Sequence, residues 1–305
     1  MNSTSQTSAA AQAAVVACSR CKSLRGGDTT RDWLISWRRP RVPRMATVQV
    51  HHEFTGSPEA PVLVLAGPLG STLKIFDPLV GSLAERFRVL RYDHRGHGAS
   101  PVPSGPYAIA DLGADALALL DRLGIERAAF CGLSLGGMAG IWLAAHAPQR
   151  LSALVLCSTS AHYDDHGPWI EREAAVRWAG TASIARDVVS RWFTPRWAAT
   201  HPGVVAQAVQ MISETSDEGY AACCGAIATW DGRRLLARIS APTLVIAGSQ
   251  DMGTPVKPHA HILANGIYRA KLEVLDAAHL AIIEHADQGI QLITNHVLAH
   301  ASEQV

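Results

Sequence analysis

From residue 61 onward, short apolar runs alternate with segments of helical periodicity, and this alternation restricts the chain to few folds. Six runs rich in β-branched and aliphatic residues predict buried strands, each bounded by polar, Gly or Pro residues: 61–67, 88–93, 128–134, 151–157, 242–248 and 270–276. Nearly continuous apolar runs are typical of parallel strands covered on both faces. We therefore expect an α/β fold: a mostly parallel sheet with right-handed crossovers and helices on both faces.

Two segments between these strands carry a clear helical pattern. Residues 111–124 place five apolar side chains along one face of a helix: Leu112, Ala116, Leu119, Leu120 and Leu123. Residues 138–147 are apolar almost throughout and end at Pro148. A helix of this kind is expected to be buried against the sheet.

The alternation stops between about residues 160 and 238. This segment has helical stretches, no convincing strand, and five tryptophans: Trp169, Trp178, Trp192, Trp197 and Trp230. We interpret it as a helical cap inserted between two strands of the sheet. Most of these tryptophans are expected to form the cap's own core, and one or two to face a ligand.

Residues 1–44 differ in composition from residues 45–305, which we assign to the α/β domain with its inserted cap. They carry seven Arg, one Lys and two Asp, a net charge of +6, whereas the rest carries −5 because the whole chain is at +1. We expect a disordered tail, or a working protein that begins at Met45; an organelle transit peptide is a lesser alternative. The apolar run of this tail, at residues 9–18, is not preceded by a basic residue, which argues against a secretory signal.

Charge and cysteine usage exclude several classes of protein. A net charge of +1 gives no support for a nucleic-acid partner. No apolar run reaches the roughly 20 residues that a membrane span needs. Cys18 and Cys21 form an isolated CxxC that lacks the remaining ligands of a zinc site. Cys131 and Cys157 lie in apolar runs as expected for buried thiols, so we infer a reducing, cytoplasmic compartment.

The most informative short motif is Gly-Leu-Ser-Leu-Gly at 132–136. A predicted strand precedes it and a predicted helix follows it, which is the context of a nucleophile elbow centred on Ser134. The small flanking residues allow the close backbone approach of a strained turn. Ser134 is therefore the candidate nucleophile.

A serine nucleophile needs a histidine base and a carboxylate that orients it, in the chain order Ser, acid, His. Asp251 follows the predicted strand at 242–248, and His279 follows the strand at 270–276. Asp276 is a rival for the acid, although it lies at the edge of its strand. Asp93 is expected to brace a loop and to pair with Arg95, and His94, His97, His285 and His296 are assigned to loops or the surface.

The tetrahedral intermediate needs two backbone N–H donors. One is expected from Leu135, the residue after the nucleophile. The other is expected from the loop after the strand at 61–67, where Pro68 has no N–H. Leu69 is the first candidate in that loop, and Gly70 is the second.

Several longer segments together resemble the 3-oxoadipate enol-lactonases of the α/β-hydrolase fold. They are RYDHRGHGASPVP, GPYAIADLGADALALLDRLGIE, the segment around the elbow, RWFTP, GYAACCGAI, PTLVIAGSQDMGTP and AAHLAIIEHAD. The segments IWLAAHAPQR, RWFTP and GYAACC are the more particular to enol-lactonases. The chain departs from the family pattern at Gly67 and Pro68, in a loop that faces the reacting centre.

The resemblance implies a serine hydrolase that opens 3-oxoadipate enol-lactone to 3-oxoadipate in aromatic catabolism, with no cofactor and no metal. Ser134, Asp251 and His279 match the family's triad, with Leu69 and Leu135 as oxyanion donors. The substrate also carries a carboxylate, and the sequence does not choose among Arg95, Arg177 and Arg191 as its receiver. Trp142, eight residues beyond the elbow, is a candidate substrate contact or a packing residue.

Two other classes stay open. One is a different serine hydrolase: a carboxylesterase, a hydrolase of meta-cleavage products, or a cofactor-free perhydrolase. The other is a non-enzymatic protein of the same fold that binds a ligand or partner, although no member of the triad is missing. The sequence does not determine the oligomeric state.

Overall fold

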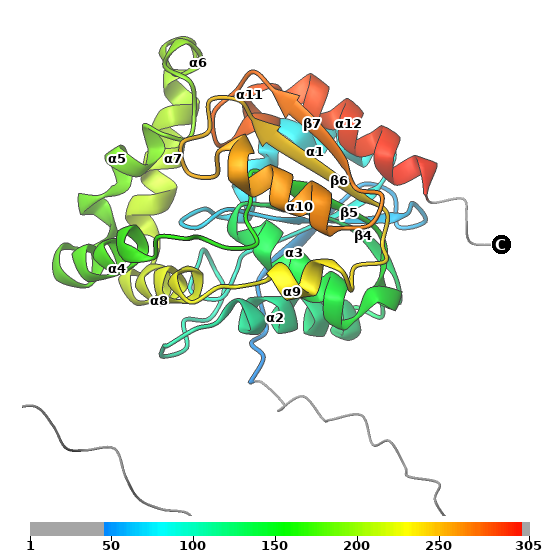
Figure 1. Ribbon diagram of the computed structural model, residues 1–305, viewed down its shortest axis with the longest axis horizontal. Helices are drawn as coiled ribbons and strands as arrows, with labels where there is room; N and C mark the ends of the chain where they lie inside the picture. Colours follow the sequence, from blue (N-terminus) through cyan, green and yellow to red (C-terminus); the bar gives the residue numbers. More distant parts are fainter. Residues whose placement is uncertain (1–45, 301–305) are drawn as a thin grey trace, which may run out of the picture. The chain divides into compact units, whose positions relative to one another are not determined.

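The computed structural model describes residues 46–300, which are built around one seven-stranded sheet (Figure 1). The strand order is β1-β3-β2-β4-β5-β6-β7, with β1 antiparallel to β3 and every other pair parallel. The strands are β1 (His52–Thr55), β2 (Val62–Ala66), β3 (Arg88–Tyr92), β4 (Ala128–Leu133), β5 (Leu151–Cys157), β6 (Thr243–Gly248) and β7 (Lys271–Leu275). The expected mostly parallel α/β sheet is confirmed, and all six predicted strands form.

The centre of the sheet is buried as its apolar runs predict. Every residue of β4 and β6 is buried, and in β5 only Ser152 is partly accessible. The prediction of a buried strand is wrong for β7, where Val274 is 46% exposed. The reason is its position, since β7 ends the strand order and has a neighbour on one side only.

Helices cover both faces of the sheet (Figure 1). On one face α1 packs against α12, and on the other α3 packs against α2 and α9. These and the remaining helices of the sheet domain are α1 (Asp77–Ala84), α2 (Ile109–Arg122), α3 (Leu135–His146), α9 (Arg233–Leu236), α10 (His261–Gly266), α11 (Ala281–Glu284) and α12 (Ala286–Ala299), with short turns η1 (Leu73–Phe76), η2 (Pro148–Arg150) and η4 (Val256–Ala260).

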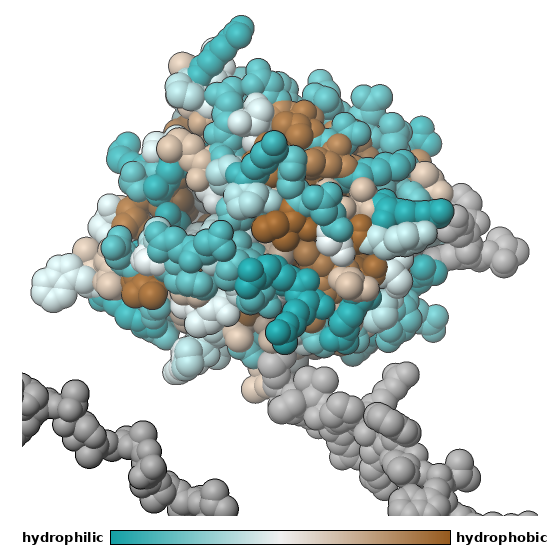
Figure 2. All heavy atoms as spheres, viewed as in Figure 1, coloured by the Kyte–Doolittle hydropathy of each residue, from teal (hydrophilic) through white to brown (hydrophobic). Residues whose placement is uncertain are grey.

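The two helices read from the sequence form with their expected apolar faces. In α2, Leu112, Ala116, Leu119 and Leu120 are buried and Leu123 is partly buried just after its end. All residues of α3 from Leu135 to Ala145 are buried, because the helix lies directly on β2, β4 and β5. Hydrophilic side chains dominate the face seen in Figure 2, with hydrophobic areas over α10 and β7.

Between β5 and α9 the chain contributes no strand to the sheet, and we call the helices and turns of this segment the cap. Its elements are α4 (Gly167–Ala179), η3 (Thr181–Ser183), α5 (Ala185–Val189), α6 (Pro195–Thr200), α7 (Pro202–Glu214) and α8 (Asp217–Ala228). Within it α4 packs along α8, and α7 packs against α5 (Figure 1). Because the cap leaves the sheet at the carboxyl end of β5, it lies beside the loops that follow the parallel strands.

The cap tryptophans divide between packing and exposure. Trp192 and Trp230 are buried, and Trp197 stacks on Phe193 and His201. Trp178 instead is 92% exposed.

Residues 1–44, including Cys18 and Cys21, lie outside the described residues, so the expectations for this tail stay predictions.

Candidate active site

Ser134 occupies a sharp turn between β4 and α3. Its backbone has φ 56° and ψ −112°, a conformation that non-glycine residues rarely adopt. The turn is held from several sides: the Ser134 N–H donates to Cys157 O at 2.9 Å, and the Thr159 hydroxyl donates to Ser134 O at 2.6 Å. Surrounding contacts thus stabilise a strained residue whose side chain projects at the carboxyl edge of the sheet.

The two glycines of the motif are required by close backbone approach. A Cβ on Gly132 would lie 2.3 Å from Gly136 O, and a Cβ on Gly136 would lie 2.1 Å from Ala66 O. The Gly136 N–H also donates to Gly67 O at 3.0 Å. The elbow is therefore packed directly onto the loop that follows β2.

Tertiary structure brings Ser134, His279 and Asp251 into one hydrogen-bonded series. The Ser134 Oγ lies 2.9 Å from His279 Nε2, and His279 Nδ1 lies 2.8 Å from Asp251 Oδ2. A carboxylate only accepts, so His279 Nδ1 carries the proton and Nε2 is free to accept the Ser134 proton. The three residues follow β4, β6 and β7, whose carboxyl ends meet at one edge of the sheet.

Asp251 is held as a charged acceptor. Its Oδ1 accepts the N–H groups of Gly253 at 2.8 Å and Thr254 at 3.0 Å, and its Oδ2 also accepts the Thr254 hydroxyl at 2.6 Å. Burial alone would raise the pKa of Asp251, but the His279 charge and these hydrogen bonds outweigh burial and lower the pKa to about 2. The rival Asp276 is exposed and accepts instead from Ser249 and Gln250.

The two backbone amides predicted as oxyanion donors lie at the elbow and in the loop that packs against it. Within residues 46–300, neither the Leu69 N–H nor the Leu135 N–H donates to a protein acceptor. The second candidate in the loop is engaged, because the Gly70 N–H donates to His97 Nε2 at 2.9 Å. Of the two candidates in the loop after β2, the geometry thus leaves Leu69 available as a donor.

Two histidines that the sequence analysis assigned to loops or the surface are buried beneath this loop. His94 Nε2 donates to Gly67 O at 3.1 Å, and His97 accepts from Gly70. Burial lowers the pKa of both rings, that of His94 to about 3. Both rings are therefore neutral at pH 7 and position the loop. The sequence signal was their place in HRGHG, residues 94–98, shortly after β3, which neighbours β2 in the sheet.

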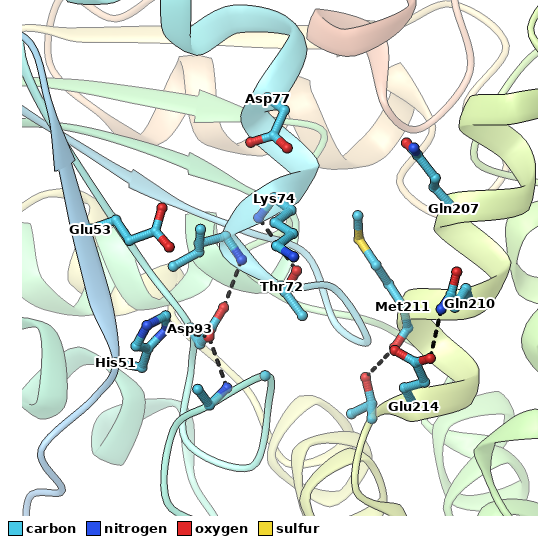
Figure 3. A pocket seen from close by; sticks show the side chains of 14 residues that line it. His51, Glu53, Thr72, Lys74, Asp77, Asp93, Gln207, Gln210, Met211 and Glu214 are labelled. Atoms are coloured by element: carbon cyan, nitrogen blue, oxygen red, sulfur yellow. Dashed lines mark hydrogen bonds and ion pairs between the residues drawn. The ribbon is translucent and has the colours of Figure 1, made fainter.

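Asp93 braces the same region, but not by pairing with Arg95 as expected. Its carboxylate accepts the N–H groups of Leu73 at 2.7 Å and Ala99 at 3.0 Å, and contacts His51 (Figure 3). Arg95 instead binds Asp115 through Nε and Nη2 at 2.6 and 2.8 Å. A cavity of about 640 Å³ lies here, and among residues 46–300 its lining includes no member of the series.

A different cavity, of about 410 Å³, opens directly onto Ser134 and His279. Apolar and aromatic cap residues form part of its wall: Tyr163, Pro168, Trp169, Val188 and Trp192. Arg172 and Arg191 also line it, and the sequence analysis had not singled out Arg172. Two of the five cap tryptophans thus face the space in which a ligand would lie.

Trp142 does not line this cavity. Its indole stacks on the His146 ring with centroids 4.3 Å apart, and a Cβ added to Gly113 of α2 would lie 2.3 Å from it. Trp142 therefore packs between α2 and α3. Of the two roles that the sequence left open for Trp142, these contacts favour packing over substrate contact.

Comparison with known proteins agrees with this architecture. The family model described as "alpha/beta hydrolase fold" matches residues 60–286. The chain belongs to the α/β-hydrolase family. Among described relatives, this hydrolase is 40% identical to 3-oxoadipate enol-lactonase 2 of Acinetobacter baylyi, over 78% of this chain and 88% of the relative. The resemblance read from the sequence is confirmed.

Solved structures give the same relationship. The enol-lactonase from Burkholderia xenovorans LB400 superposes with a TM-score of 0.80 and 38% identity, over 82% of this hydrolase and 97% of that chain. A hydrolase from Pseudomonas aeruginosa superposes with a TM-score of 0.79 and 42% identity, over 82% of this chain and 94% of that chain.

Within residues 46–300 of this chain, no helix is long and apolar enough to cross a membrane.

Proposed function

We propose that this hydrolase opens the ring of 3-oxoadipate enol-lactone to give 3-oxoadipate, a step of the β-ketoadipate pathway. The observation that carries the proposal is the hydrogen-bonded series Ser134–His279–Asp251 at a cavity, in a chain 40% identical to an enol-lactonase. Ser134 is the nucleophile, His279 the base and Asp251 the orienting acid. The substrate is a small lactone or ester, with no nucleic-acid or membrane partner.

The first half of the reaction forms an acyl-enzyme. His279 Nε2 takes the Ser134 proton as Oγ attacks the lactone carbonyl carbon, and the imidazolium is stabilised by Asp251. The Leu69 and Leu135 amides donate to the oxyanion, each worth about 3 kcal/mol in comparable hydrolases. Collapse of the intermediate breaks the ring C–O bond. The enol oxygen leaves, receives the proton from His279 and tautomerises to a ketone.

The second half consumes one water. His279 takes a proton from the water as its oxygen attacks the acyl ester, and then returns the proton to Ser134 Oγ as the free acid leaves. These steps use only side chains and backbone amides of the chain. The cap's part is to enclose the substrate over the elbow, since Trp169 and Trp192 line the cavity beside Ser134.

We also place the protein in the cytoplasm. Cys131 and Cys157 support this, because their sulfurs lie 3.9 Å apart as free, buried thiols. Buried thiols held near each other without a disulfide suit a reducing compartment.

The test is the loss of ultraviolet absorbance of freshly made enol-lactone, with wild type and Ser134→Ala measured side by side. We expect rapid turnover by wild type and at least about 10³-fold less by the variant. Equal melting temperatures of the two proteins would show that the variant folds. Cleavage of 4-nitrophenyl acetate without lactone turnover would favour another esterase of the family, and no activity on either would favour a binding protein.

A further inference from the structure

The proposed substrate carries a free carboxylate besides the lactone, so the site needs a partner for that charge; this inference rests on the proposed function. Two of the three arginines considered from the sequence are already engaged elsewhere. Arg95 is buried against Asp115, as described above. Arg177 is exposed and pairs with Glu173 at 3.1 Å and Glu218 at 2.6 Å. Neither lines the cavity at Ser134.

Arg172 and Arg191 are the arginines that line the cavity. Arg191 is partly neutralised, because its Nη2 lies 2.9 Å from Asp187 Oδ2. Arg172 forms no ion pair within 4.0 Å among residues 46–300; its guanidinium lies over the Trp169 ring, 4.7 Å from the centroid. A cation–π contact orients a guanidinium without cancelling its charge. Arg172 therefore presents an uncompensated positive charge in the cavity that contains the nucleophile.

Two acids also line this cavity, but within the described residues neither forms an ion pair with Arg172. Asp164 is 88% exposed and lies 3.3 Å from His162 Nε2, and Asp165 is exposed and accepts the Gly167 N–H at 2.9 Å. Both carboxylates are therefore solvated and engaged. Arg172 is half-buried beside apolar wall residues, where water screens a bound anion less than at the surface.

We propose that the Arg172 guanidinium binds the free carboxylate of the substrate while the scissile carbonyl lies at Ser134. The substrate class is thus lactones and esters whose acyl chain ends in a carboxylate. A planar guanidinium can hold a carboxylate through two parallel hydrogen bonds, which gives orientation as well as affinity. Charge-assisted hydrogen bonds of this kind correspond to about 10- to 100-fold in kcat/KM.

A matched pair of probes tests this without the lactone. Mono-4-nitrophenyl glutarate and 4-nitrophenyl butyrate have acyl chains that differ only by the terminal carboxylate. We expect wild type to prefer the glutarate, and Arg172→Met to lower its kcat/KM about 10- to 100-fold, mainly through KM, while butyrate changes less than about 3-fold. Arg172→Lys should fall between the two, because it keeps the charge but not the paired donors.

Controls separate the remaining explanations. Arg186→Met, an exposed arginine on α5 that does not line the cavity, should leave both probes unchanged. An equal loss on both probes in Arg172→Met would mean a structural role, and no loss on either would also overturn the inference. Loss of the glutarate preference in Arg191→Met but not in Arg172→Met would assign the carboxylate to Arg191. Failure of wild type on the enol-lactone would instead refute only the proposed lactone.

Discussion

The Gly70 amide donates a hydrogen bond to His97 Nε2 at 2.9 Å, and this contact joins the loop after β2 to the loop after β3. His97 Nδ1 lies 3.1 Å from Arg95 O, so Nδ1 carries the proton and Nε2 accepts. The bond engages the Gly70 amide and leaves that of Leu69 free. A buried histidine thus removes one of the two candidate oxyanion donors of the loop and leaves the Leu69 amide free.

The first prediction concerns that contact. His97→Ala leaves the buried Gly70 N–H without an acceptor, which costs about 1–3 kcal/mol in unfolding free energy. We expect a lower melting temperature and a kcat about 10-fold lower on both ester and lactone, because the Leu69 amide shifts. His97→Gln, whose side-chain oxygen can accept, should recover part of both. Unchanged kcat and melting temperature in His97→Ala would show that the loop holds its shape by other contacts.

The second prediction distinguishes the two candidate acids. Asp251→Asn keeps the shape of the side chain but no longer fixes the His279 proton on Nδ1, so kcat should fall about 10⁴-fold, as in serine proteases. Asp276→Asn is the matched control, since Asp276 is exposed and bound to Ser249 and Gln250. In steady-state kinetics on a nitrophenyl ester, kcat of Asp276→Asn should stay within about 2-fold of the wild-type value. A larger loss in Asp276→Asn than in Asp251→Asn would reverse the assignment.

The third prediction tests the close approach at the elbow. Gly136→Ala places a Cβ 2.1 Å from Ala66 O, so the free energy of unfolding should fall by about 3 kcal/mol or more, with loss of activity. Gly81→Ala is the control, because Gly81 is exposed within α1 and a Cβ there meets nothing within 4 Å. That variant should gain up to about 1 kcal/mol. Urea unfolding measures both, and equal stabilities would contradict the elbow geometry.

The fourth prediction concerns pH. Burial lowers the pKa of His94 to about 3, whereas an unfolded histidine titrates near 6.5. Between these values the unfolded chain binds the proton and the native state does not, so stability falls as pH falls below about 6.5. At pH 4.5 this one group accounts for roughly 2–3 kcal/mol relative to pH 7. Urea unfolding at both pH values should show a smaller loss in His94→Gln than in wild type; an equal loss would assign the effect to other groups.

The sequence alone determined the secondary-structure elements and the order of the candidate catalytic residues along the chain. Apolar runs and helical periodicity predict the strands and helices, because side-chain burial repeats along each element with a fixed period. Several features can be identified without tertiary contacts: the glycines at 132 and 136, the helix after Ser134, and the order of Ser134, Asp251 and His279. A parallel sheet then brings the ends of β4, β6 and β7 to one edge, so the proposed triad could be chosen from sequence.

Only the tertiary structure decided contacts between segments that no local pattern links. Whether Trp142 faces a ligand or α2 depends on helix packing, and exposure of β7 depends on the strand order. Identical residue types have opposite environments: Arg95 is buried against Asp115, whereas Arg172 faces the cavity without a carboxylate partner within the described chain. The sequence shows which residues are charged. Whether an arginine is neutralised depends on its distance from a carboxylate, and folding alone sets that distance.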